Sequence, residues 1–166
     1  MNNHITRRQV VDRLTENGIP FAIVPLRSDV SIVLSQRGGR VLGPFLSEEG
    51  ESLFWTPAPY GDATAFREFL ASGHWNAGGD RIWIAPEVQY NPKGSPPPAS
   101  DPGTWALDQV GASQWRLQQS MTVEAFNLAS GSKELHIERR LRPAPDPLRY
   151  LPDAARPAGN LLYAGY

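Results

Sequence analysis

Glycine and proline interrupt this chain so often that few segments are long enough for a helix. Its 166 residues include 15 glycines and 16 prolines, many of them after position 57. They gather in three stretches, at residues 57–62, 91–103 and 143–159. Because both residue types favour turns over the interiors of helices and strands, the pattern indicates short strands joined by long loops and is not that of a helical bundle.

Apolar and alternating runs between these interruptions mark the expected elements. Residues 5–17 are expected to form a helix, since Thr6 and Gln9 have the spacing of a capping box and Asn17-Gly18 is a typical helix end. A brief second helix is expected at 64–72. Strands are expected at 21–26, 30–35, 41–45, 53–56, 81–85, 105–110, 114–119, 122–128 and 134–141.

Many short antiparallel strands with turn signals every ~8–12 residues predict a mainly β fold, an antiparallel β-sandwich. We expect residues 1–18 to form an N-terminal helix and residues 19–166 to form the sandwich. Loop 91–103 is too rich in turn formers to be expected in the core. The last strand alternates well, except that Arg139 falls on its apolar side.

Composition excludes several classes of function. The net charge of −1 gives no reason to expect binding to nucleic acid or to an anionic membrane. No apolar run approaches the ~18 residues of a membrane span, and the polar start lacks a signal-peptide core. The chain has no cysteine, and its three histidines show no ligand spacing, so neither a metal nor a cofactor is expected. A cytoplasmic location is the default expectation, and export is also compatible with the absence of cysteine.

The most informative segment is residues 78–87, which read Gly-Gly-Asp-Arg-Ile-Trp-Ile-Ala-Pro-Glu. Asp80 and Arg81 can hydrogen-bond hydroxyl groups, and Trp83 can stack on the apolar face of a ring. The two glycines allow the backbone to approach a neighbour closely. These are the groups that a sugar-binding cleft needs.

Residues 78–87 also resemble a signature of uncharacterised bacterial branches of the galactose mutarotase-like (aldose 1-epimerase-like) superfamily, Gly-Gly-[Asp/His]-Arg-[Leu/Ile]-Trp-x-[Ala/Ser]-Pro-Glu. Leu-Phe-Trp-Thr-Pro at 53–57 and Leu-His-Ile-Glu-Arg-Arg-Leu at 135–141 flank it in the family's order. Gly-Arg-Val at 39–41 matches an early family turn. The resemblance runs from about residue 20 to the C-terminus and corresponds to the N-terminal half of the family domain.

The resemblance implies a β-supersandwich that binds a carbohydrate in a cleft on one sheet. In the family's epimerases a histidine is the general acid and a glutamate the general base on the anomeric hydroxyl. The catalytic glutamate of the family has no counterpart here. Residues 161–166 look like a strand within a sheet, so the sandwich is expected to be incomplete at its C-terminus.

Each polar candidate has a structural alternative. Arg81 is expected to bind substrate, and the alternative is an internal salt bridge to Asp80 or Glu87. Glu87 is a candidate base or sugar ligand, although a solvated or salt-bridged carboxylate is the more common role at a strand end. For Asp80, the alternative to binding hydroxyls is stabilising the turn beside Gly79.

The aromatic and histidine candidates are weighed in the same way. Trp83 is a candidate stacking platform, but a position in the sandwich core is favoured because isoleucines flank it. His74 lies on an expected loop and is the candidate catalytic acid, with a structural role as its alternative. His136 is expected to be a cross-strand neighbour.

Two function classes follow from the sequence. The first is a carbohydrate-binding or carbohydrate-active domain of mutarotase-like type, whose epimerase-like reaction would need the missing acid–base half. The second is a non-catalytic structural or interaction module. In that case open sheet edges would pair with a second copy or with another chain.

Overall fold

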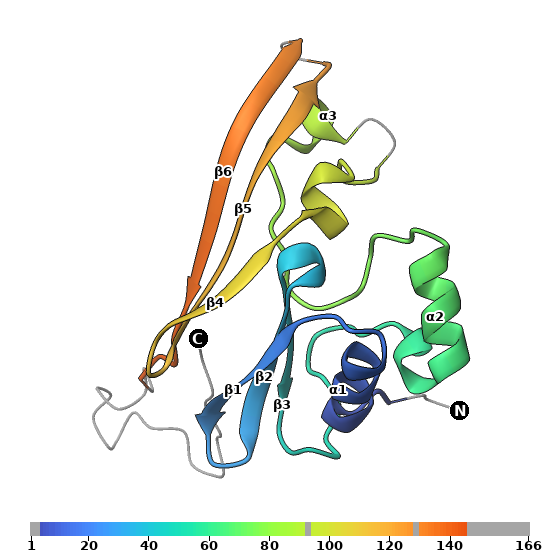
Figure 1. The fold of residues 1–166 in the computed structure, drawn as a ribbon, viewed down its shortest axis with the longest axis vertical. Helices are drawn as coiled ribbons and strands as arrows, with labels where there is room; N and C mark the ends of the chain where they lie inside the picture. The colour runs from blue at the N-terminus through green and yellow to red at the C-terminus, as the bar shows by residue number, and fades with distance from the viewer. Residues whose placement is uncertain (1–3, 92–93, 128–129, 146–166) are drawn as a thin grey trace, which may run out of the picture.

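Two three-stranded antiparallel sheets form the framework of the protein (Figure 1). The computed structural model describes residues 4–91, 94–127 and 130–145. The first sheet has the order β1-β2-β3 and the second β4-β5-β6. Their bounds are β1 Phe21–Arg27, β2 Val30–Ser35, β3 Arg40–Phe45, β4 Ala106–Gly111, β5 Gln114–Ala125 and β6 Gly131–Leu141. The expected mainly β, sandwich-like fold with a short N-terminal helix is confirmed.

Within the described residues, three helices and three short helical turns accompany the sheets. The helices are α1 Arg7–Glu16, α2 Ala63–Ala71 and α3 Glu87–Tyr90. The turns are η1 Arg37–Gly39, η2 Ala58–Gly61 and η3 Ala99–Gly103. None of the helices in the described part of the chain has both the length and the apolar character needed to cross a bilayer. The cytoplasmic location stays a prediction.

Helix α1 begins and ends where the sequence predicts. The N–H of Gln9 donates to the Thr6 hydroxyl at 3.2 Å, and the N–H of Thr6 donates to the Gln9 side chain at 2.9 Å, which completes the capping box. The last helical residue is Glu16, and Asn17 is the C-cap, followed by Gly18 with a positive φ of 63°. Val10 and Leu14 are fully buried, so this helix shares a core with β2 and β3.

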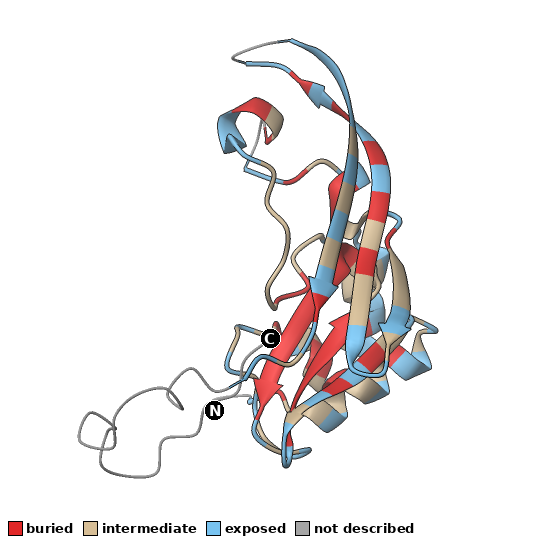
Figure 2. Cartoon of the chain, turned by 90° about the vertical axis from the view of Figure 1, so that its left-hand side faces the viewer, coloured by how far each residue is buried: buried red, intermediate tan, exposed pale blue. Residues whose placement is uncertain are grey.

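Strands β2 and β3 of the first sheet are buried along their whole length, whereas edge strand β1 has exposed positions (Figure 2). Strand β2 is buried at all six positions, because α1 and α2 cover one face and the second sheet covers the other. Val33 and Phe45 face the helices together with Phe66 of α2. On the opposite face a second core joins the two sheets, and it contains Ala22, Val24, Ile32, Leu34, Val41, Trp105, Leu117 and Leu141.

The second sheet is dominated by a long hairpin. Strands β5 and β6 pair in register from Trp115↔Leu141 to Ala125↔Gly131. The two strands expected at 114–119 and 122–128 are one strand as far as Ala125, because no turn former separates them and the alternation of buried positions continues through Met121. Residues 128–129 lie outside the described part of the chain.

The strands expected at 53–56 and 81–85 do not form. The outer edge of β3 is shared between the two segments: Leu53 and Phe54 donate to the carbonyls of Pro44 and Gly43, while Asp80 exchanges backbone hydrogen bonds with Val41 alone. A six-residue strand has no room for two full partners on one edge. Each segment therefore makes a short contact and leaves the sheet.

Loop 91–103 differs from expectation in its burial. Its last part forms η3, where Ser100 and Asp101 are buried. The expectation that this loop stays out of the core is wrong for these residues. The C-terminal strand expected at 161–166 lies outside the described residues, and the division at residue 18 stays a prediction.

Candidate functional site: arginines and tryptophans around Asp101

A buried carboxylate is the centre of the candidate site. The Asp101 residue is 4% exposed and forms an ion pair with Arg40, which is 1% exposed. Arg40 also donates to the backbone carbonyls of Gly78 at 2.9 Å and Trp75 at 3.0 Å. One guanidinium therefore ties η3, β3 and the 75–78 segment together.

A second guanidinium reaches the same carboxylate from the 78–87 segment. Arg81 Nη1 lies 3.5 Å from Asp101 Oδ2. Its guanidinium carbon lies 3.6 Å from the ring centroid of Trp83 and 4.3 Å from that of Trp75, which is within the range of cation–π attraction. We call Trp75, Arg81 and Trp83 the Arg–Trp platform, and Arg40, Arg81 and Asp101 the Asp101 cluster.

Burial and neighbouring charges shift the pKa values of the Asp101 cluster in opposite directions. Burial raises the pKa of the Asp101 carboxyl, and the nearby guanidinium groups of Arg40, Arg81 and Arg37 act in the opposite direction. Burial likewise lowers the pKa of Arg40 and of Arg81, and Asp101 opposes both shifts. Asp101 is thus ion-paired with two guanidinium groups, those of Arg40 and Arg81, and feels a third, that of Arg37, at longer range.

Glycines allow the segments of the site to approach one another. A side-chain carbon on Gly79 would lie 2.4 Å from the Val41 carbonyl oxygen, and one on Gly78 would lie 2.6 Å from the Trp55 carbonyl oxygen. Both glycines also have a positive φ. The glycine pair lets its backbone approach β3 and the 55–57 segment closely, while a close approach to a sugar stays a prediction.

A row of aromatic rings connects the platform to α2. Trp75 lies 6.4 Å from Trp83 between ring centroids and 6.3 Å from His74, whose ring in turn lies 5.4 Å from that of Phe69. His74 is exposed, and its Nδ1 accepts a hydrogen bond from the Asn76 N–H at 3.2 Å.

The structure brings four of the five expected site residues into one neighbourhood. Arg81 and Trp83 form the platform, His74 stacks on Trp75, and the exposed Glu87 is close enough to act electrostatically on Arg81. Trp83 is half-buried and stacks on Arg81 rather than filling either core, so the favoured core position is wrong.

Asp80 is the one expected site residue whose side chain does not join this neighbourhood. Its carboxylate pairs with Arg139 of β6 at 2.6 Å. Arg139 also donates to the Gly39 carbonyl at 2.8 Å, so the arginine on the apolar side of the last strand links the two sheets. The internal partner of Arg81 is Asp101 in place of the expected Asp80 or Glu87. His136 pairs with Ser120 across the hairpin, as expected.

Sequence reasoning missed Asp101 and Trp75 as members of the site. Asp101 lies in a Pro/Ser-rich stretch without periodicity, so no pattern marked it as buried. Trp75 is the next residue after His74 in the sequence, and this position beside a candidate residue could have indicated that Trp75 belongs to the site. Within the described residues, no three His, Asp or Glu side chains gather closely enough to hold a metal ion.

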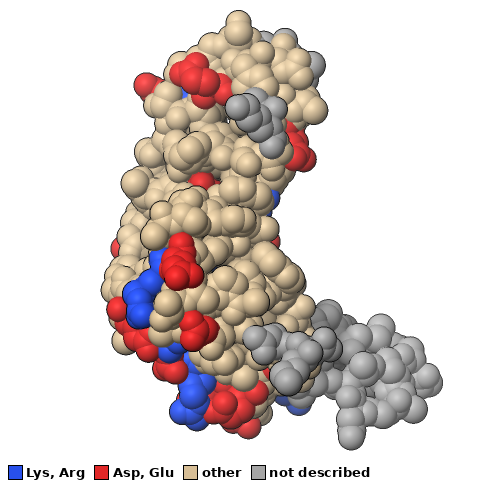
Figure 3. All heavy atoms as spheres, turned by 90° about the vertical axis from the view of Figure 1, so that its right-hand side faces the viewer, with Lys and Arg blue, Asp and Glu red and all other residues tan. Residues whose placement is uncertain are grey.

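Charged groups elsewhere are mixed in sign. On the face shown in Figure 3, basic and acidic side chains lie side by side near the lower end rather than in separate patches. Arg8, for example, pairs with Glu48 and Glu49. The absence of nucleic-acid and membrane partners stays a prediction.

Comparisons with models of protein families, with curated proteins and with solved structures found no match for this chain. The mutarotase-like resemblance therefore rests on the sequence motifs alone. The function must be argued from the site itself.

Proposed function

We propose that this protein binds a carbohydrate at the Arg–Trp platform. The observation that carries the proposal is the placement of the Arg81 guanidinium, 3.6 Å from the Trp83 ring centroid and 3.5 Å from the buried Asp101. A sugar presents hydroxyl groups at its rim and an apolar face of C–H groups. An arginine beside indole rings offers a partner for each of these surfaces.

Preorganisation supports the same proposal. Burying an arginine is costly unless its charge is compensated, and here Asp101 compensates both Arg40 and Arg81. The side chain of Arg81 is 18% exposed and held from two sides, so little rotational freedom remains to be lost when a ligand binds. The exposed Glu87 adds a carboxylate that can accept hydrogen bonds from hydroxyls.

The proposal concerns binding, and a reaction would require more. Ring opening needs a proton donor and a proton acceptor on either side of the sugar. His74, beside Trp75, is the proposed donor if a reaction occurs, and Glu87 is the group next to the platform with the chemistry of an acceptor. We therefore place an epimerase-like activity second to binding.

Calorimetric titration with a panel of neutral monosaccharides tests the proposal. Binding at the millimolar level corresponds to only ~4 kcal/mol, so each sugar should be raised to about 10 mM. At least one sugar is expected to give a saturable heat with wild-type protein and a much smaller one with Arg81→Met. Arg67, exposed on α2, provides the control Arg67→Met. Saturable binding that is unchanged by Arg81→Met would place the ligand elsewhere.

A second candidate function is assembly through a sheet edge. Strand β6 is 11 residues long and stands at the edge of its sheet, with no strand beyond it among the described residues. Exposed edges of this kind pair readily with another chain. Light scattering over a range of protein concentrations tests this idea: the mass should rise toward that of a dimer, and a constant monomer mass would contradict it.

A further inference from the structure

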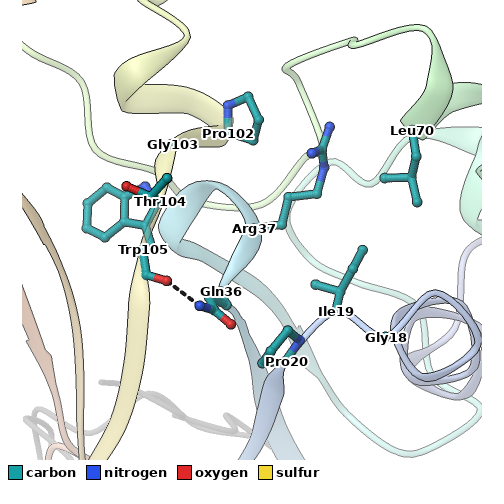
Figure 4. Close-up of a pocket in the computed structure, with 10 residues that line it drawn as sticks. All are labelled: Gly18, Ile19, Pro20, Gln36, Arg37, Leu70, Pro102, Gly103, Thr104 and Trp105. Atoms are coloured by element: carbon teal, nitrogen blue, oxygen red, sulfur yellow. Dashed lines mark hydrogen bonds between the residues drawn. The ribbon is translucent and has the colours of Figure 1, made fainter. Parts of the chain in front are cut away.

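A pocket separate from the Arg–Trp platform lies between α1, α2 and the start of β4 (Figure 4). Its volume is about 500 Å³, within the range of roughly 300–1,000 Å³ that small-molecule sites occupy. The walls include Ile19, Pro20, Leu70, Pro102 and Trp105, so most of them are apolar. Arg37 of η1 supplies the charged group.

The Arg37 side chain is directed into this pocket. In Figure 4 it extends from η1 into the space between Pro102 and Leu70, above Ile19. One of its terminal nitrogens donates to the His74 carbonyl at 3.2 Å. Its Nε is buried and has no hydrogen-bond partner among the described residues, and no carboxylate of the described chain lies within ion-pair distance of this guanidinium. The described residues therefore leave part of the hydrogen-bonding capacity of this guanidinium unused.

Three other polar groups of the pocket already have partners within the protein. The Gln36 amide donates to the Trp105 carbonyl, the Trp105 indole N–H donates to the Ser100 carbonyl at 3.1 Å, and the Thr104 N–H donates to Gln119 at 3.0 Å. Among the buried side-chain nitrogen and oxygen atoms of the lining residues, only one of Arg37 lacks a hydrogen-bond partner.

The local charge also favours an anion. Arg37 acts on the Asp101 carboxylate only at longer range, and that carboxylate is already ion-paired with Arg40 and Arg81. One guanidinium among apolar walls suits a monoanion better than a dianionic phosphate, which would need further donors.

We propose that this pocket binds an organic carboxylate with a compact apolar body, held by a forked contact from Arg37. The apolar body would lie against Leu70, Ile19 and Trp105. This proposal does not rest on the sugar-binding proposal, because its charged residue is Arg37 and the platform uses Arg81, although Arg37 also contacts the His74 carbonyl near the platform.

Calorimetry and amide NMR with 3-phenylpropionate test the proposal, with its neutral amide, 3-phenylpropionamide, as the matched probe. The carboxylate is expected to bind with a dissociation constant on the order of 1 mM or below and to shift the amide signals of Gly18 and Gly103, which line the pocket. The neutral amide should bind about tenfold or more weakly.

Variants assign the contact. Arg37→Met should weaken carboxylate binding about tenfold or more, Arg37→Lys should weaken it less, and Arg67→Met should leave it unchanged. If Arg37→Met does not fold, Leu70→Trp, which fills the pocket and keeps Arg37, should abolish binding. Three results would overturn the proposal: equal binding of the amide and the carboxylate, no binding up to about 10 mM, or unchanged carboxylate binding in folded Arg37→Met. If Arg37→Met does not fold, unchanged binding in Leu70→Trp would overturn it. Loss of sugar binding in Arg81→Met would leave it intact.

Discussion

At the scale of single residues, the structure depends on one buried acid. Asp101 brings Arg40 and Arg81 together, and Arg40 in turn fixes the backbone carbonyls of Trp75 and Gly78. A buried ion pair of this kind contributes little net stability compared with an apolar core, but removing one partner leaves an uncompensated charge. Its main effect here is to hold the platform in one geometry.

Asp101→Asn is expected to destabilise the protein by about 3–5 kcal/mol, because two largely buried guanidinium groups would lose their counter-charge. Asp108→Asn is the matched control, since Asp108 pairs with Arg116 while its side chain is 43% exposed, and it should cost no more than about 1 kcal/mol. Urea unfolding measures both. Equal effects of the two substitutions would contradict the role given to Asp101.

Gly39→Ala tests the packing of η1 on the second sheet. Gly39 has a φ of 56°, and an added side-chain carbon would lie 2.6 Å from the Trp105 ring, so we expect a loss of about 2–4 kcal/mol from strain and overpacking together. Gly73 has a similar φ of 70° with nothing within 4 Å. Gly73→Ala should therefore cost only about 1 kcal/mol in thermal or urea unfolding. A Gly39→Ala loss as small as that of Gly73→Ala would argue against the tight contact.

Part of the site can be predicted at this scale. The glycine pair at 78–79 and the arginine that follows it are visible in the sequence, because an unusual local composition marks them. Asp101 is not visible, since its burial depends on contacts with Arg40 and Arg81, 61 and 20 positions away in the chain. Sequence patterns report local periodicity and carry no information on such pairings.

At the scale of elements, the sequence predicts correctly those helices and strands whose formation depends on neighbouring residues in the chain. Helix α1 follows from its capping box, and the β1–β2 hairpin follows from two alternating runs around a turn. The strands expected at 53–56 and 81–85 failed for a non-local reason, since both segments compete for the edge of β3. Strand propensity cannot reveal how much edge is free.

Arg139→Met tests the link between the two sheets. Arg139 reaches from β6 to the Gly39 carbonyl and to Asp80, with a side chain only 12% exposed, so its loss should cost about 1–3 kcal/mol. Arg140→Met on the same strand removes a side chain that is 76% exposed and should cost about 0.5 kcal/mol or less. Urea unfolding measures the free energy of unfolding of both variants. Similar decreases in the two would show that the contacts of Arg139 between the sheets add no stability beyond that of an exposed arginine.

At the scale of the whole molecule, the two sheets form the scaffold and their connection carries the proposed chemistry. The Arg–Trp platform and Asp101 all lie in the connection between β3 and β4, residues 46–105, and Arg40 at the start of β3 anchors them. Loops held on a rigid scaffold are common places for binding sites. The mutarotase-like relationship stays a prediction, because it rests on short sequence motifs and no family model, curated protein or solved structure matches this chain.

The most direct test of the central claim, sugar binding at the platform, is a calorimetric comparison of Trp83→Ala with Phe126→Ala. Phe126 is an aromatic residue, 44% exposed, just beyond the end of β5 and outside the platform. With a sugar that binds the wild-type protein, Trp83→Ala should weaken binding by about 1–3 kcal/mol, the magnitude of a lost stacking contact, while Phe126→Ala should bind as the wild type does. No saturable binding of any monosaccharide up to about 10 mM, or equal binding by the two variants, would contradict the account.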